Sequence, residues 1–132
     1  MRVATGIAII IAASATMVKG QSLQEQAICA QEAKAAFQEL KAGASDYVSH
    51  YNKKLNKCFI LINRMSEING QPAMSADLYD AIERREFASY TQLTKLGKSD
   101  LLHCELKPTL QEGTICSSKQ EFDAFVSKYM EE

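Results

Sequence analysis

The chain has 132 residues, of which 46% are apolar and 23% charged, with six glycines and two prolines. This composition excludes a disordered or collagen-like chain. Its 15 basic and 16 acidic residues give a net charge of -1, which excludes a strongly basic nucleic-acid binder, so we expect no nucleic acid among the partners. The length predicts one domain.

The first twenty residues have the pattern of a signal peptide. Arg2 precedes an uncharged stretch, 3–18, whose centre, 7–13, is continuously apolar. A membrane-spanning helix needs about 20 predominantly apolar residues, and this stretch is shorter and contains polar residues. We therefore predict a periplasmic or secreted protein with no stable membrane anchor after cleavage. Cleavage is predicted after Gly20, with Ala15 as the alternative.

The rest of the chain, 21–132, is expected to form a single disulfide-stabilised α+β domain. It contains four cysteines, and an even number in an exported protein is typical of a disulfide framework. The spacing lacks the two close pairs typical of structural zinc, so we predict no metal site and no cofactor. The four are Cys29, Cys58, Cys104 and Cys116.

A helix is predicted over 22–42. Ser22 and Glu25 match a capping box, in which each side chain accepts a hydrogen bond from the backbone of the first turn. An apolar stripe that includes Cys29 follows at helical spacing, and Gly43 supplies the end of the helix. Cys29 is therefore expected to face the core.

A β-hairpin is predicted over 46–64. In its first half Tyr47, Ser49 and Tyr51 alternate with Val48, His50 and Asn52, and a polar break follows at 53–56. Its second strand is apolar at successive positions, which indicates a strand buried on both faces. Cys58 lies near the start of that strand.

The middle of the chain is less regular. Residues 66–76 are expected to form a loop, because they contain a turn signal and no periodic apolar pattern. Beyond it, 78–83 and 86–93 are predicted to be strands of a second hairpin, and one continuous helix over 76–96 is the alternative.

The last elements are a strand and a helix. The strand is predicted over 101–106 and ends before Pro108. Ser118 and Glu121 form a second capping box, which opens a helix with an apolar stripe. The stripe consists of Phe122, Phe125, Val126 and Tyr129.

These elements predict an α+β fold, with an antiparallel sheet of about four to five strands packed against an N-terminal and a C-terminal helix. We expect both helices to cover one face of the sheet. Cys104 leaves the last strand and Cys116 precedes the last helix, so this pair is favoured, which leaves Cys29 for Cys58. The two other pairings remain open.

One segment carries a resemblance. Residues 49–59 read Ser-His-Tyr-Asn-Lys-Lys-Leu-Asn-Lys-Cys-Phe, and a late cysteine pair and the helix at Glu121-Phe122 follow. Together they resemble small exported four-cysteine bacterial proteins of uncharacterised function. The resemblance implies a place in the bacterial cell envelope, and it carries over no activity and no site residue.

The two histidines do not complete a catalytic or metal-binding set in the sequence. His50 points away from Ser49 and Tyr51 on a strand, so these neighbours cannot form a nucleophile and base pair. His103 and Glu105 share a strand face and, with His50, would make an open zinc site; the same spacing is typical of a solvated face. We predict no catalytic residues.

Four carboxylates lie close together in the sequence near two arginines. A glycosidase needs two carboxylates, one with a raised pKa, and neighbouring arginines would instead favour the ionised form. We predict that the group forms a solvated turn. It consists of Asp77, Asp80, Glu83 and Glu86, with Arg84 and Arg85.

The tyrosines suggest a binding surface. Tyr47 and Tyr51 share one strand face, and Tyr79 or Tyr90 would extend the patch if its strand lay beside theirs. Such a patch is suited to contacting a protein or peptide, whereas packing beneath a helix is the structural alternative. Tyr47, His50 and Tyr51 are therefore the candidate ligand-binding residues.

The leading hypothesis is a non-catalytic binding or interaction module of the bacterial cell envelope, whose partner is a protein or a small ligand. One alternative is a small envelope hydrolase that uses His50. The other is a structural or assembly protein that acts as an oligomer.

Overall fold

The computed structural model describes residues 17–40 and 43–131, so most of the predicted signal peptide, 1–16, lies outside the described residues. Helices and strands account for most of the described chain. In order they are α1 (Met17–Leu40), β1 (Ala44–Asn52), β2 (Lys57–Ile68), β3 (Gln71–Asp80), β4 (Glu86–Lys95), β5 (Lys98–Leu106), β6 (Thr114–Ile115) and α2 (Lys119–Met130).

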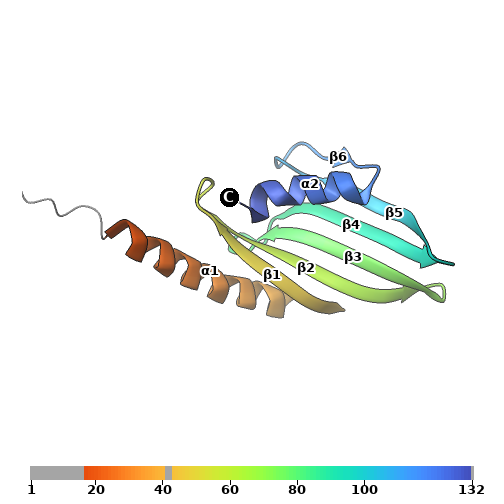
Figure 1. Ribbon diagram of the computed structural model, residues 1–132, viewed down its shortest axis with the longest axis horizontal. Coiled ribbons are helices and arrows are strands. Elements are labelled where there is room, and N and C mark those ends of the chain that lie inside the picture. The colour runs from red at the N-terminus through yellow and green to blue at the C-terminus, as the bar shows by residue number, and fades with distance from the viewer. Residues whose placement is uncertain (1–16, 41–42, 132) are drawn as a thin grey trace, which may run out of the picture.

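The strands form one antiparallel sheet in the order β1-β2-β3-β4-β5-β6 (Figure 1). The α+β class is confirmed, with six strands in the described sheet rather than four or five. Each strand pairs with its neighbour in the chain, because the connections are short. The continuous helix considered for 76–96 is not formed, since β3 and β4 occupy this region.

The loop predicted over 66–76 is wrong. β2 and β3 continue through it and meet at a two-residue turn, Asn69-Gly70. These residues have φ angles of 52° and 76°, the left-handed values that a tight hairpin turn requires, and Asn-Gly is the residue pair that best adopts them. The strand ends are mostly exposed, with Ala73 the buried exception, so the apolar alternation that identifies a strand is missing there.

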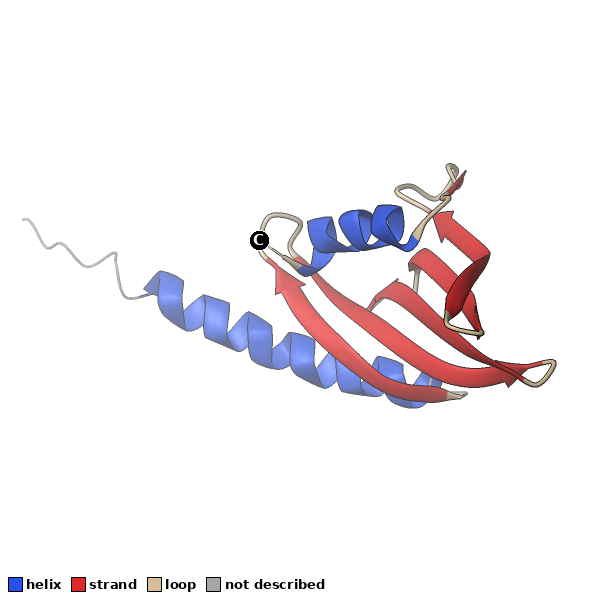
Figure 2. Ribbon diagram, turned by 45° about the vertical axis from the view of Figure 1, so that its right-hand side comes forward, coloured by secondary structure: helices blue, strands red, loops and turns tan. Residues whose placement is uncertain are grey.

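The two helices cover opposite faces of the sheet, and the expectation that both lie on one face is wrong (Figure 2). The reason is in β2, where successive residues point to opposite sides. Cys58, Ile60 and Ile62 belong to the cluster beneath α1, whereas Phe59 packs in the cluster beneath α2. A central strand that is apolar on both faces requires a covering element on each side.

The α2 side contains an aromatic core. Phe59 packs edge-on against Phe87, with 5.4 Å between ring centroids, and against Tyr129 at 5.1 Å. The capping box of α2 is confirmed on one side: the Ser118 hydroxyl accepts a hydrogen bond from the Glu121 N–H, 3.2 Å away. The Glu121 carboxylate accepts from Ser117 instead of Ser118.

The α1 side is held by small residues and a disulfide. Ala33 and Ala36 are fully buried against the sheet, and Cys29 is joined to Cys58 of β2. The second disulfide joins Cys104 to Cys116, so the structure contains the favoured pairing. No helix in the described part of the chain has the length and apolarity needed to cross a membrane.

The N-terminal capping box is wrong. α1 begins at Met17, so the backbone at Ser22 is already helical, and a capping residue must be extended. Gly43, placed at the end of the helix, has φ of 71°, which favours glycine.

Candidate functional site

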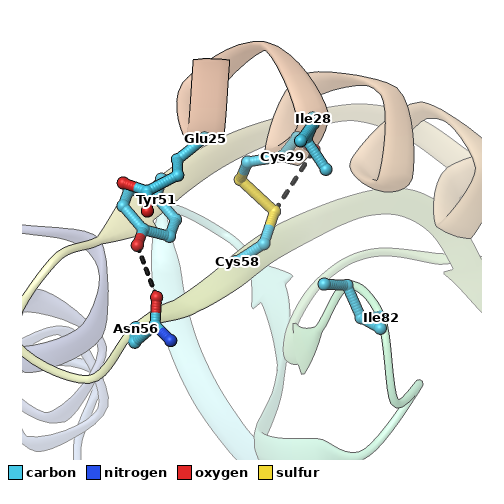
Figure 3. A pocket seen from close by; sticks show the side chains of 7 residues that line it. All are labelled: Glu25, Ile28, Cys29, Tyr51, Asn56, Cys58 and Ile82. Carbon is cyan, nitrogen blue, oxygen red and sulfur yellow. Dashed lines mark hydrogen bonds between the residues drawn. A yellow bond between two sulfur atoms is a disulfide. The ribbon is translucent and has the colours of Figure 1, made fainter. Parts of the chain in front are cut away.

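A pocket of 240 Å³ lies where α1, the β1–β2 hairpin and the turn between β3 and β4 meet (Figure 3). The Cys29–Cys58 disulfide lines it, which ties its helical wall covalently to its strand wall. The lining residues are Glu25, Ile28, Cys29, Tyr51, Asn56, Cys58 and Ile82.

Two isoleucines give the pocket exposed apolar walls. Ile28 precedes Cys29 in α1 and lies outside the buried stripe, with 47% of its surface exposed. Ile82 is 58% exposed and lies in the β3–β4 turn, whose Ala81 N–H donates to the Cys58 carbonyl at 2.8 Å. Aliphatic side chains exposed beside a pocket are the usual anchors for an apolar group of a partner.

Asp80 holds the turn that carries Ile82. One of its oxygens accepts from the backbone N–H groups of Ile82 and Glu83 at 2.8 and 2.9 Å, and the other accepts from Lys57 at 2.8 Å. Burial would raise the pKa of Asp80, but these hydrogen bonds outweigh it and leave the pKa below its ordinary value. Hydrogen bonds to Asp80 and then to Glu83 raise the pKa of Lys57.

The other end of the pocket is polar. The Tyr51 hydroxyl donates to the Asn56 side-chain oxygen at 2.6 Å, and Glu25 of α1 lies beside the tyrosine (Figure 3). Partial burial, together with the Glu25 carboxylate, raises the pKa of Tyr51. Asn56 has φ of 51° in the β1–β2 turn, a conformation that asparagine tolerates better than most residues. This end presents a carboxylate and a hydroxyl to a ligand.

The structure does not bring the three predicted binding residues together. Tyr51 lines the pocket, but Tyr47 stacks on Phe37 beneath α1, with 4.6 Å between ring centroids. His50 pairs with Phe59 and faces α2, and its Nε2 is buried without a hydrogen-bond partner among the described residues. The two tyrosines therefore share one face, His50 points to the other, and His50 and Tyr51 both line a second pocket of 370 Å³.

The other tyrosines are divided in the same way. Tyr79 packs against the cluster beneath α1, on the face that Tyr47 and Tyr51 share. Tyr90 is buried in the cluster beneath α2. Tyr79 therefore shares the face of the predicted patch, and Tyr90 does not.

The prediction that the four neighbouring carboxylates form a solvated turn is only partly correct. Asp80 is buried, and Asp77 forms an ion pair with Arg64 in the sheet. Burial raises the pKa of Asp77, although Arg64 opposes it. Glu83, which is exposed, fits the prediction. The prediction fails for the aspartates because both belong to β3 and not to the turn, and they point to opposite faces of the sheet.

The face of the sheet that α1 covers also carries polar side chains farther along, on β4 and β5. Ser89 and His103 contact each other at 2.8 Å between Oγ and Nε2. These are the atoms of a nucleophile and a base, but β4 pairs with strands on both sides, so its backbone N–H groups are engaged in the ladder and do not form an oxyanion hole. No cluster of three metal-ligating side chains occurs among the residues described.

Sequence reasoning missed most of the pocket. Glu25, Ile28, Asn56 and Ile82 are each ordinary in the sequence, and only their packing brings them together. One signal was available: Ile28 is an aliphatic residue outside the apolar stripe of its helix.

Two further pockets lie beside the helices. One of 370 Å³ lies on the other flank of α1, against β1, and one of 170 Å³ lies beside the start of α2. A comparison of the chain with protein-family models, curated proteins and solved structures found no match.

Proposed function

We propose that the protein is an exported binding module of the bacterial cell envelope that takes an apolar side chain of a protein partner into the 240 Å³ pocket. The observation that carries this is the exposure of Ile28 and Ile82 on either side of a disulfide-lined pocket. What distinguishes this pair from other exposed aliphatic residues is that both line one pocket, where a partner's apolar group would cover them.

The polar end of the pocket restricts the chemical class of the ligand further. The Glu25 carboxylate lies beside the Tyr51 hydroxyl, so a cation or hydrogen-bond donor next to the apolar group would be favoured. A peptide with a large apolar residue beside lysine or arginine has this chemistry.

The cellular location is part of the proposal. Two disulfides are stable in an oxidising compartment, which supports export to the periplasm or the medium. Cleavage of a signal peptide after Gly20 would leave most of α1, including Cys29, in the mature chain. The likeness to small exported four-cysteine proteins of bacteria points the same way.

A random peptide library displayed on phage, panned against the oxidised protein, tests the pocket. We expect clones that combine a large apolar residue with a basic neighbour. Ile82→Glu should weaken their binding about tenfold or more, because it places a charge in the apolar wall. Titration calorimetry with synthetic copies of the clones measures the loss.

The matched control is Leu110→Glu, which introduces the same charge in place of an exposed leucine outside the pocket. It should leave affinity unchanged. Clones that bind wild-type and Ile82→Glu protein equally well would contradict the proposed site.

A further inference from the structure

The two disulfides lie in different surroundings. Cys29 and Cys58 both line the 240 Å³ pocket (Figure 3), whereas Cys104 and Cys116 are packed in the cluster beneath α2 and do not line it. Cys29 and Cys58 are only 3% and 2% exposed, so a molecule in solution reaches their sulfurs through the pockets that they line. A ligand in the 240 Å³ pocket would therefore cover this disulfide.

The helix α1 is anchored unevenly along its length. In its second half, Ala33 and Ala36 are fully buried, and Phe37 stacks on a tyrosine of β1 with 4.6 Å between ring centroids. In its first half, every residue from 22 to 28 is exposed or half-buried. Cys29 lies between these two parts, and its disulfide joins the helix to β2.

The two apolar walls of the pocket depend on this disulfide to different degrees. Ile28 belongs to the weakly packed part of α1 and directly precedes Cys29. Ile82 lies in the β3–β4 turn, which is held to β2 by the hydrogen bond from the Ala81 N–H to the Cys58 carbonyl at 2.8 Å. The strand wall therefore has its own support, whereas the helical wall is fixed by the covalent bond beside it.

One polar contact also lies on the helical wall. Glu25 is beside Tyr51, and both residues are half-buried. A hydrogen bond that water can replace adds little stability. Without the disulfide, the part of α1 before Ala33 is expected to open locally, because poorly buried helix ends open at low free energy. Ile28 would then no longer lie opposite Ile82.

We propose that the Cys29–Cys58 disulfide is a redox gate for the pocket: the oxidised protein binds its partner, and reduction releases it. This inference rests on the proposed function, because it concerns the same pocket. A chain with reduced cysteines would bind weakly, and oxidation after export would complete the site. Binding and oxidation are reciprocal, so a ligand that prefers the oxidised protein also favours the disulfide by the same factor.

The reductant is a dithiol, either a small molecule or a thiol–disulfide reductase. Its thiolate attacks one cysteine sulfur, the S–S bond breaks, and a mixed disulfide forms while the other cysteine leaves as a thiolate and takes a proton. The second thiol of the dithiol then displaces the first cysteine. Two electrons and two protons pass to the protein, which gains two thiols, and the dithiol becomes a disulfide.

The wild-type protein provides the first test. Dithiothreitol is added with and without a synthetic peptide from the phage panning, and free thiols are alkylated at intervals and assigned by mass spectrometry. With the peptide at about ten times its Kd, we expect reduction of Cys29–Cys58 to slow about fivefold or more. Cys104–Cys116 is the internal control, and its rate should not change. Equal rates for Cys29–Cys58 with and without peptide would overturn the gate.

A second test measures affinity in both redox states. Replacing Cys104 and Cys116 by alanine leaves only the pocket disulfide, and its reduction should weaken the peptide about tenfold or more while hydrogen exchange in α2 stays slow. The matched control replaces Cys29 and Cys58 by alanine. It should bind weakly with or without dithiothreitol, because its remaining disulfide lies outside the pocket.

The outcomes separate this inference from the proposed function. Equal affinity of the oxidised and reduced protein would overturn the gate and leave the pocket as the binding site. A loss of affinity accompanied by equally fast exchange in α2 would also overturn it, because the whole domain would then have unfolded. Binding to oxidised protein that Ile82→Glu does not weaken would instead contradict the proposed pocket, and with it the gate.

Discussion

The two faces of the sheet are covered in different ways. Beneath α2, four phenylalanines and two tyrosines fill the space, and their rings pack edge-on or tilted. Beneath α1, buried alanines allow the helix to approach the sheet closely, and a disulfide fixes it there. The pockets on the two flanks of α1 are larger than the pocket of 170 Å³ beside α2.

We therefore expect the α2 side to contribute mainly to stability and the α1 side to contribute mainly to binding. Burial of aromatic area is the larger source of stability, so the α2 side is expected to contribute most to the free energy of unfolding. The α1 side has open pockets of 240 and 370 Å³ on its two flanks. A covalent link at the pocket keeps its walls in place without filling the space.

The largest expected effect is on the α2 side. Phe59→Ala should lower the free energy of unfolding by about 4 kcal/mol, because it removes the ring that contacts Phe87 and Tyr129. Urea denaturation followed by circular dichroism measures this. Met65→Ala in the same strand, 60% exposed, should cost less than about 0.5 kcal/mol. A similar loss in both variants would refute the idea of an aromatic core.

The next effect is on the α1 side. Replacing Cys29 and Cys58 together by alanine should cost about 3.5 kcal/mol, the loop-closure value for their sequence separation of 29. Hydrogen exchange should then quicken in α1 and remain slow in α2. Replacing Cys104 and Cys116 is the control, since it should leave exchange in α1 unchanged. Equal loss of protection in both helices would contradict the asymmetry.

The smallest effect concerns the turn beside the pocket. Asp80→Asn should cost about 2 kcal/mol at neutral pH, because Lys57 loses the buried one of its two carboxylate partners. The folded state lowers the pKa of Asp80, so this contribution is present above the unfolded pKa of about 3.9 and disappears as the pH falls through the folded pKa. Urea denaturation at neutral and strongly acidic pH should show wild type and variant converging.

Glu83→Gln is the control for this ion pair. Glu83 contacts the same lysine at 2.8 Å but is more than half exposed, so the change should cost less than about 0.5 kcal/mol. A difference between Asp80→Asn and wild type that persists at acidic pH would show that the carboxylate charge is not the cause.

Much of the fold could be predicted from local chemistry. The capping serine of α2 and the polar break at 53–56 are local signals, and the structure contains both a helix and a turn at these places. The β2–β3 hairpin was missed because its exposed ends lack alternation, although Asn69-Gly70 marked the turn. The double-sided apolar pattern of β2 already required a helix on each face.

The candidate site could not be predicted in the same way. Its walls come from α1 and a turn more than fifty positions later in the chain, and only the sheet register and the disulfide place Ile28 near Ile82. Tyr51 was chosen for its chemistry and does line the pocket. Tyr47 and His50 were not distinguishable from it in the sequence, because burial depends on which helix covers which face.

Chemical-shift mapping tests the central claim, that partners bind on the α1 side, most directly. Nitrogen-15-labelled protein is titrated with peptides selected from the random library without any counter-selection. We expect the largest shifts around Ile28, Ile82 and Tyr51. Shifts centred on Met74 and Phe122, beside α2, would contradict it.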